Sequence, residues 1–400
     1  MLRQNTSKET MQKNTFPLWP SHEADEIAAV VRVLESGRVN YWSGEEGCAF
    51  EREFAHYHGV SHGVAVANGT VALDLALIAL GLGPGDEVIV TPRTFLASAS
   101  SIVNAGARPV FADVDRNSGN ITPETVRSVL TPRTRAVMAV HLAGWPCDMD
   151  GIMKLSQEHG LYVIEDCAQA HGARWKGRPA GSMGHVGAFS FCTDKIMSTG
   201  GEGGMVITSD EKLWHRMWSY KDHGKSWDAV YHREHPPGFR WLHESFGTNW
   251  RLTEMQSALG RIQLKKLDRW FQRRRENARV LADGLCPLPG LRVPLPEPHM
   301  EHAWYKFYAF VRPEELKAGW SRDRIAQTLQ DKGIPCLHGG CSEVYLEKAF
   351  DGGFRPRERL PVARELGETS LMFLVHPTLE REHMERVVRA VGEVMERACK

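Results

Sequence analysis

The sequence predicts an α/β fold built around a doubly wound parallel sheet. Short β-rich runs occupy residues 87–90, 109–112, 136–140 and 162–164, and helical or glycine-containing segments separate them. Strands that alternate with helices in this way form parallel sheets with crossover helices. In such sheets ligands bind beyond the carboxyl ends of the strands. The residues that directly follow each run are therefore the candidates for a functional site.

Length and composition limit the classes of protein that the chain can belong to. The 400 residues are enough for a substantial core and two or three domains, and 42% hydrophobic with 24% charged residues is ordinary for a soluble globular protein. Lys+Arg and Asp+Glu both number 49, so no overall charge attracts nucleic acid or an anionic membrane. We expect no nucleic-acid partner and no membrane partner.

Cysteine usage and the chain start indicate the compartment. The eight cysteines are scattered singly, with no CxxC pair, which favours reduced thiols over a disulfide framework or a zinc site. Residues 1–14 carry no apolar core of the kind a secretory signal needs, and no later run is long enough to span a membrane. These patterns predict a cytoplasmic protein without a bound metal.

The N-terminal region is predicted to hold a leader and one helix. Residues 1–16 are predicted to be a flexible leader. A helix is expected over 21–36, because Ile27, Val30, Val31 and Leu34 recur at helical spacing, with Ser21 as its N-cap and Gly37 as its stop.

The rest of the chain divides into two predicted domains. The large domain is expected over residues 17–286, and a long excursion at about 214–241, rich in His, Lys, Trp and Tyr, interrupts it. Five prolines in 287–298 indicate a linker, so a smaller C-terminal α/β domain is expected over 287–400. A long helix capped by Thr253 is predicted to run towards Arg275.

A glycine turn early in the large domain is a candidate phosphate site. The apolar run at 64–67 leads into Asn68-Gly69-Thr70 and then into a helix rich in Ala and Leu. A helix that starts directly after a strand presents free N–H groups and a partial positive charge to an anion. Many α/β turns share this pattern without binding an anion, so Gly69 and Thr70 need support from elsewhere in the chain.

Three further candidates follow predicted strands. Asp166, at a strand end, suits the ring nitrogen of a pyridine cofactor, because a carboxylate keeps that nitrogen protonated. The structural alternatives are a helix N-cap for Asp166, core packing for Phe95 and a helix-surface amide for Gln169. The aromatic loop at 39–44 has a similar ambiguity, since it either faces substrate or packs as a core loop.

Lys195 is the strongest candidate for a catalytic residue. An apolar run ends at Ser190, and Lys195 precedes the glycine cluster 200–204. A lysine amine in a confined place traps carbonyl groups, and glycines let the backbone approach a flat cofactor. With Ser190 as a phosphate ligand, the stretch suggests pyridoxal phosphate held on Lys195 as a Schiff base. The alternative is a surface lysine before a glycine turn.

A nicotinamide-dependent enzyme is disfavoured. Such an enzyme needs a G-x-G-x-x-G fingerprint after the first strand, with an acidic residue about 20 positions on. Asn68-Gly69-Thr70 does not supply it.

The order of these motifs is that of a known family. In chain order the shared motifs are Phe50-Glu51, Asn68-Gly69-Thr70, Glu165-Asp166-x-Ala168-Gln169-Ala170, Ser190-Phe191-x3-Lys195, Gly201-Glu202-Gly203-Gly204 and Asn249-x-Arg251. On these motifs the sequence resembles the sugar aminotransferases of the DegT/DnrJ/EryC1/StrS family, over nearly the whole chain. The resemblance implies fold type I of the pyridoxal phosphate enzymes: a large domain with a mostly parallel seven-stranded sheet between helices, and a smaller C-terminal α/β domain.

The resemblance also assigns roles to individual residues. Lys195 matches the lysine that holds the cofactor, Asp166 the partner of the ring nitrogen and Gln169 the neighbour of the phenolic oxygen. The remaining matches are Gly69, Thr70 and Ser190 for phosphate binding, Phe95 for stacking on the ring, and Asn249 for reaching the phosphate in the neighbouring subunit. The last match implies a homodimer with shared active sites.

The function implied by the resemblance is amine transfer. The family uses pyridoxal 5'-phosphate to move an amino group from an amino acid, in most members L-glutamate, to a nucleotide-linked 4-keto-6-deoxy or 3-keto hexose. The products serve surface polysaccharide or glycosylated metabolites. Lys195 favours this activity over that of a dehydrating branch, which has histidine instead. Cyclitol-ketone aminotransferases, aminohydroxybenzoate synthases and a non-catalytic cofactor-binding regulator stay open as alternatives.

Overall fold

The computed structural model describes residues 16–400, in which a seven-stranded sheet forms the centre of the large domain. The strands follow the order β1-β9-β8-β5-β4-β2-β3. Every neighbouring pair is parallel except the two pairs that β9 makes with β1 and β8. The predicted mostly parallel, doubly wound sheet is confirmed. Its strands are β1 (His62–Val66), β2 (Glu87–Val90), β3 (Arg108–Phe111), β4 (Thr134–Val140), β5 (Tyr162–Asp166), β8 (Val186–Ser190) and β9 (Gly204–Thr208).

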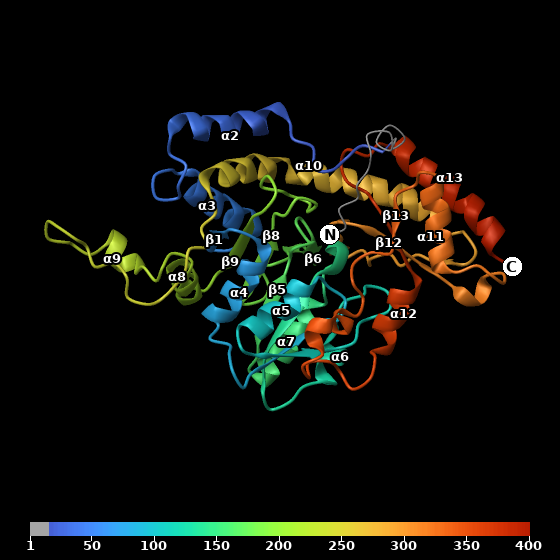
Figure 1. Cartoon of the computed structure of the whole chain (residues 1–400), viewed down its shortest axis with the longest axis horizontal. Coiled ribbons are helices and arrows are strands. Elements are labelled where there is room, and N and C mark those ends of the chain that lie inside the picture. Colours follow the sequence, from blue (N-terminus) through green and yellow to red (C-terminus); the bar gives the residue numbers. More distant parts are fainter. Residues whose placement is uncertain (1–15) are drawn as a thin grey trace.

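Helices cover both faces of this sheet (Figure 1). Side chains alternate along each strand, so that Val64 and Val66 pack with one group of helices and Ala65 with the other. One face is covered by α4 (Gly69–Ala79), α5 (Leu96–Asn104) and α8 (Glu211–Tyr220). The other face is covered by α3 (Glu46–His58), α7 (Met149–His159) and the first part of α10 (Glu254–Leu285).

Helix α10 connects the large domain to the small one (Figure 1). Thr253 caps it as predicted, and a capping box with Gln256 reinforces the start. The helix continues past the expected end at Arg275 to Leu285. Its last part contributes Leu281 and Leu285 to the core of the small domain. One continuous helix therefore belongs to both cores.

The small domain has a four-stranded antiparallel sheet in the order β10-β12-β14-β13. The predicted linker 287–298 already contains β10, so the chain joins the small sheet within the proline-rich stretch. Phe16, the last residue of the predicted leader, is buried against this domain, and residues 1–15 lie outside the described part. The elements are β10 (Leu291–Arg292), β12 (Phe307–Val311), α11 (Arg322–Asp331), β13 (Cys336–Leu337), α12 (Pro361–Thr369), β14 (Ser370–Phe373) and α13 (Arg381–Ala398).

The excursion expected from about residue 214 begins later than predicted. Residues 211–220 form α8, in which Met217 and Trp218 are fully buried, because this face of the helix is apolar and packs on the sheet. Only α9 (Trp227–Tyr231) and the chain that follows it project from the body (Figure 1). Phe239 and Trp241 in this projection are 74% and 81% exposed, which marks it as an uncovered apolar surface.

The first helix also differs from the prediction. Helix α2 (Ala24–Ser36) has Glu23 rather than Ser21 at its N-cap. Ile27, Val31 and Leu34 face solvent, although their spacing suggested a buried stripe. The helix instead turns Ala29 and Val33 towards α10 and buries Glu26, which lies 3.4 Å from Lys266. The ion pair between Glu26 and α10 thus fixes the orientation of α2 about its own axis, and it leaves the apolar stripe at Ile27, Val31 and Leu34 exposed to solvent.

The smaller elements complete the described chain. A three-stranded sheet in the order β11-β6-β7 joins both domains, and α6 lies after β3. These elements are α6 (Pro123–Arg127), β6 (Arg174–Trp175), β7 (Arg178–Pro179) and β11 (Met300–Glu301). Across residues 16–400 no helix is both long and apolar enough to cross a membrane. All eight cysteines are free thiols.

Phe54 tests the packing that supports β8. The ring is fully buried and contacts Phe50, Phe189 and Phe191. We expect Phe54→Ala to lower the free energy of unfolding by about 3–5 kcal/mol, because it removes a large side chain and leaves a cavity. Denaturant unfolding followed by circular dichroism measures the change. Phe54→Leu is the matched control and should lose much less; equal losses would contradict the cavity argument.

Candidate active site

The predicted phosphate ligands come together where α4 starts and β8 ends. Asn68 caps α4, and its side-chain oxygen accepts the N–H of Val71 at 3.0 Å. The backbone of Gly69 lies so close to Ser190 that a Cβ on residue 69 would stand 2.5 Å from the Ser190 Cβ. Only glycine fits this approach. The free N–H groups at the start of α4, where Thr70 lies, therefore meet the Ser190 side chain at one corner, which suits a phosphate group.

Asp166 lies one strand away, at the carboxyl end of β5. Its carboxylate is 5% exposed and accepts hydrogen bonds from the Ser98 hydroxyl at 2.7 Å and the Ala168 N–H at 3.1 Å. Thr94 in turn lies 2.7 Å from the Ser98 hydroxyl. Asp166 is not a helix N-cap, so that alternative is wrong. It is a buried, oriented carboxylate that suits a protonated ring nitrogen.

Gln169 is oriented by a strained loop after β4. Its Oε1 accepts the N–H of Ala143 at 2.7 Å, which leaves the NH₂ group as the donor for a ligand. Ala143 has φ +57°, and Gly144 follows with φ +93°. A non-glycine residue in this region is uncommon and is typical of functional loops. The interpretation of Gln169 as a surface amide does not fit this bond.

Lys195 occupies a turn directly after β8. Its carbonyl accepts a hydrogen bond of 2.8 Å from the Trp19 indole, which fixes the backbone. The side chain is 16% exposed, and its Nζ lies 4.0 Å from Asp194 Oδ1 and 5.1 Å from the centre of the Tyr305 ring. The Nζ forms no hydrogen bond within residues 16–400. It is an enclosed amine, not a surface lysine.

Two predicted residues are exposed. Phe95, next to the start of α5, is 70% exposed and so is not a core residue. Asn249 is exposed in the segment between α9 and α10.

The aromatic loop at 39–44 has one buried and one partly exposed ring. Tyr41 is buried and donates a hydrogen bond to Glu51, as expected for a core loop. Trp42 is partly exposed and donates to Asp222.

A buried carboxylate behind these residues holds the site loops. Glu165 accepts hydrogen bonds from His141 Nε2 (2.9 Å) and from the backbone N–H groups of Gly181 (2.8 Å), Met183 (2.7 Å) and Gly184 (2.6 Å). Burial opposes its charge, but these donors outweigh burial and hold the pKa of Glu165 below its ordinary value.

His141, Glu165 and the Cys167 thiol form a buried group of potential metal ligands. Both nitrogens of the His141 ring nevertheless already form hydrogen bonds, because Nδ1 accepts the Cys147 N–H at 3.0 Å while Nε2 donates to Glu165. Burial raises the pKa of Cys167 to about 12, which keeps the thiol protonated. The group is a structural hydrogen-bond cluster.

Sequence reasoning missed several residues that orient the site. Ser98 lies on the first turn of the helix after β2, and its small hydroxyl gave no distinctive signal. Ala143 acts through its backbone, which sequence rarely reveals. Tyr305 and Trp19 are brought in from distant parts of the chain. One general rule could have pointed to this region: the carboxyl ends of parallel strands lie at the same edge of the sheet, so the segments that follow them are neighbours.

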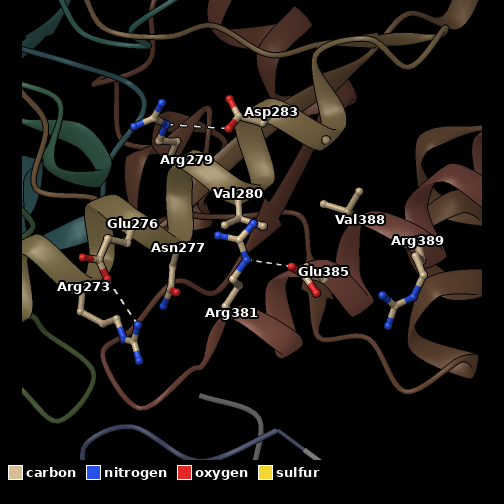
Figure 2. Close-up of a pocket in the computed structure, with 11 residues that line it drawn as sticks. Arg273, Glu276, Asn277, Arg279, Val280, Asp283, Arg381, Glu385, Val388 and Arg389 are labelled. Atoms are coloured by element: carbon tan, nitrogen blue, oxygen red, sulfur yellow. Dashed lines mark hydrogen bonds and ion pairs between the residues drawn. The ribbon is translucent and has the colours of Figure 1, made fainter.

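The broad hollow between α10 and α13 is not part of this site (Figure 2). It offers about 830 Å³ of space but contains none of the residues above. Six of its seven charged side chains pair with one another: Arg273 with Glu276, Arg279 with Asp283, and Arg381 with Glu385. Such exposed pairs form an ordinary solvated surface.

A family model for the DegT/DnrJ/EryC1/StrS aminotransferase family matches residues 20–392. The chain belongs to this family. An aminotransferase of Psychrobacter cryohalolentis has a similar solved structure, with a TM-score of 0.94 and 58% identity over 96% of this chain and 99% of that one. The site therefore lies in an aminotransferase of fold type I, and enzymes of this class depend on pyridoxal phosphate in general.

The names of two relatives of this aminotransferase state the sugar nucleotide on which each relative acts. The dTDP-3-amino-3,4,6-trideoxy-alpha-D-glucose transaminase of Streptomyces venezuelae is 40% identical, over 94% of this chain and 93% of its own. The UDP-N-acetyl-3-dehydro-alpha-D-glucosamine 3-aminotransferase of Acidithiobacillus ferrooxidans is 39% identical, over 93% and 94%.

Glu165→Gln tests the buried carboxylate. At pH 7 we expect the free energy of unfolding to fall by about 3–5 kcal/mol, because an amide cannot accept from all the donors that converge on Glu165. Since the folded-state pKa lies below the ordinary 4.5, the ionised form stabilises the fold above that value, and its contribution is lost as the pH falls through the folded-state pKa. The difference between variant and wild type should therefore shrink below pH 4.5.

Denaturant titrations at neutral and acidic pH measure this difference. Glu158→Gln is the matched control, because Glu158 forms an exposed pair with Arg127 at 3.0 Å and should change stability by less than about 0.5 kcal/mol. A Glu165→Gln loss no larger than that of the control would show that Glu165 does not anchor the loops.

Proposed function

We propose that this aminotransferase uses pyridoxal 5'-phosphate to transfer the amino group of an amino acid, L-glutamate, to a nucleotide-linked keto-sugar. The acceptor is a 4-keto-6-deoxy or 3-keto hexose, and the product is an amino sugar for surface polysaccharide or a glycosylated metabolite. The observation that carries the proposal is the enclosed Lys195 amine on the turn after β8. This strand pairs with β5, which ends at the oriented Asp166, and Ser190 at its own end meets the Gly69 corner. The sugar nucleotides named in the activities of the two relatives support the acceptor class.

The residues present fit the cofactor. The corner at Gly69 has no room for a Cβ, and Ser190 is 7% exposed at its edge, so backbone N–H and hydroxyl groups would hold the phosphate. Asp166 would bind the ring nitrogen, and the Gln169 NH₂ group would donate to the phenolic oxygen. Phe95, 70% exposed, offers a ring face for stacking. When bound, pyridoxal phosphate supplies an electron-withdrawing ring that stabilises negative charge at the carbon losing a proton.

Lys195 then has two tasks in this chain. Its Nζ would bind the cofactor covalently and, once an amino donor has replaced it there, would take up the proton that the donor's α-carbon loses. Asp194 and Tyr305 enclose this amine and limit its rotation. Asp166, oriented by Ser98, would accept a hydrogen bond from the ring nitrogen. Because donor and acceptor react in separate halves, the kinetics should be ping-pong.

We also propose a homodimer with shared sites in the cytoplasm. Asn249 is exposed in this chain, which leaves its amide available to the phosphate site of a second copy. The uncovered apolar side chains of α2, together with Phe246 at 98% exposure, support an interface. The eight free thiols support a reducing compartment.

Product analysis tests the proposed function. The purified enzyme is incubated with glutamate and, in parallel, with 4-keto-6-deoxy and 3-keto sugar nucleotides, and amino-sugar nucleotides are measured by mass spectrometry. Formation of one of them supports the proposal. Turnover only with cyclitol ketones or with an aminohydroxybenzoate precursor would contradict the acceptor class, and cofactor binding without any turnover would indicate a regulator.

Lys195→Ala should abolish both the visible absorbance of the lysine-bound cofactor and all amine transfer. The reason is that Lys195 is the amine proposed to bind the cofactor. Absorbance spectra and the product assay measure the two effects, and the exposed Lys348→Ala is the control. A variant that kept the absorbance and the turnover would refute the role of Lys195.

Asn249→Ala should weaken cofactor retention without unfolding the chain. If Asn249 serves the partner's site, cofactor loss on dilution should be faster than in wild type and should depend on protein concentration. Gel filtration with absorbance detection measures both oligomeric state and bound cofactor, with the exposed Asn104→Ala as control. Retention equal to that of the control would count against a shared site.

A further inference from the structure

A narrow cavity lies between the two domains, beside the loop that orients Gln169. Ala143 and Leu142 of that loop form one wall, and Trp304, Lys306 and Tyr308 of the small domain form another. Arg93 reaches it from the end of β2. None of the residues that line the cavity carries a carboxylate, although two of them are cations. Its free space of about 20 Å³ exceeds the room that one water molecule needs.

Arg93 is a buried cation without an acidic partner. Its side chain is 2% exposed, and the guanidinium lies 5.2 Å from the Tyr308 ring and 5.8 Å from the Phe310 ring. One nitrogen donates to the Ser342 hydroxyl. Within residues 16–400 Arg93 forms no ion pair. Burial lowers the pKa of Arg93, but a guanidinium stays charged at neutral pH.

Lys306 brings a second cation to the same cavity and links it to Lys195. Its Nζ lies 4.7 Å from the Tyr305 ring centre, and the Lys195 Nζ lies 5.1 Å from the same ring. In the described chain Lys306 has neither a hydrogen bond nor an ion pair. Burial lowers the pKa of Lys306 to about 8, with Arg274 and Lys195 acting in the same direction against Asp194. An anion bound here would offset the cost of burying the Lys306 charge.

Uncompensated buried cations are costly and are seldom retained without a partner. The cavity is too small for a sugar ring or a base, so only the small charged end of a ligand could reach the two cations. A guanidinium binds a carboxylate through paired N–H donors, and an ammonium adds a charge-assisted hydrogen bond. The position, charge and small size of the cavity therefore all favour a carboxylate as its ligand.

We propose that this cavity is a carboxylate subsite, in which Arg93 and Lys306 bind the acidic end of a substrate whose other end reacts at Lys195. The inference rests on the proposed function, since the carboxylate belongs to the amino donor or to an acidic keto-sugar. Arg93 and Lys306 are binding residues that select carboxylated substrates.

The test compares Lys306→Gln and Arg93→Gln with wild type and with the exposed control Lys348→Gln, all as cofactor-loaded enzyme. The first readout is the binding of glutarate, an unreactive dicarboxylate, by calorimetry. We expect the dissociation constant to rise about 10- to 100-fold for Lys306→Gln, as for the loss of one charge-assisted hydrogen bond. Because Arg93 is buried between the domains, Arg93→Lys serves as a second variant that keeps the charge, and it should weaken binding less than Arg93→Gln.

Half reactions identify the source of the carboxylate. Bleaching of the lysine-bound cofactor is followed with glutamate and with hydroxylamine, which has no carboxylate, and the acceptor half reaction is followed with a neutral and a carboxylated keto-sugar nucleotide. A fall in the ratio of glutamate to hydroxylamine reactivity assigns the subsite to the donor. A selective loss with the carboxylated sugar assigns it to the acceptor. Unchanged glutarate binding together with unchanged ratios overturns the proposal.

Failure of the proposed function gives a different result. If wild type does not react with glutamate or with any keto-sugar, the function fails while glutarate binding still tests the subsite. If wild type turns over but the Lys306 and Arg93 variants match the Lys348→Gln control in every readout, only the subsite is refuted.

Discussion

One buried carboxylate, that of Glu165, holds the loops on which the site depends. It accepts the hydrogen bonds of His141 and of three backbone N–H groups between residues 181 and 184, and it directly precedes Asp166. The donors offset the cost of burying its charge, so the carboxylate is stable only while these segments stay in place. Through His141 the constraint extends to the loop that orients Gln169. The geometry of the site therefore depends on buried residues that lie behind it.

The sheet accounts for the rest of the arrangement. Parallel pairing of β4, β5 and β8 brings the ends of these strands to one edge, and with them Ala143, Asp166 and Ser190. That edge could be predicted from alternation of strands and helices, because the pattern is local in the chain. The motif residues Gly69, Asp166, Ser190 and Lys195 were predicted from their place after strands and from the family resemblance.

Other features depend on contacts between distant segments, which local patterns do not encode. The rotation of α2 is one case, since Glu26 pairs with Lys266 on α10 and the apolar stripe of α2 turns to solvent. The burial of Trp218 in α8 is another, because a segment rich in charged and aromatic residues gave no sign of the apolar face that packs on the sheet. The hydrogen bond from Ser98 and the Tyr305 contact with Lys195 likewise require the folded chain.

One experiment tests the proposed role of Lys195, which is to bind pyridoxal phosphate and to release it to an amino donor. The most direct measurement is the absorbance spectrum of the purified wild-type protein before and after glutamate is added. We expect a yellow protein whose visible band bleaches with glutamate and returns when a keto-sugar nucleotide is added. A protein that stays colourless after incubation with pyridoxal phosphate would rule out this role of Lys195.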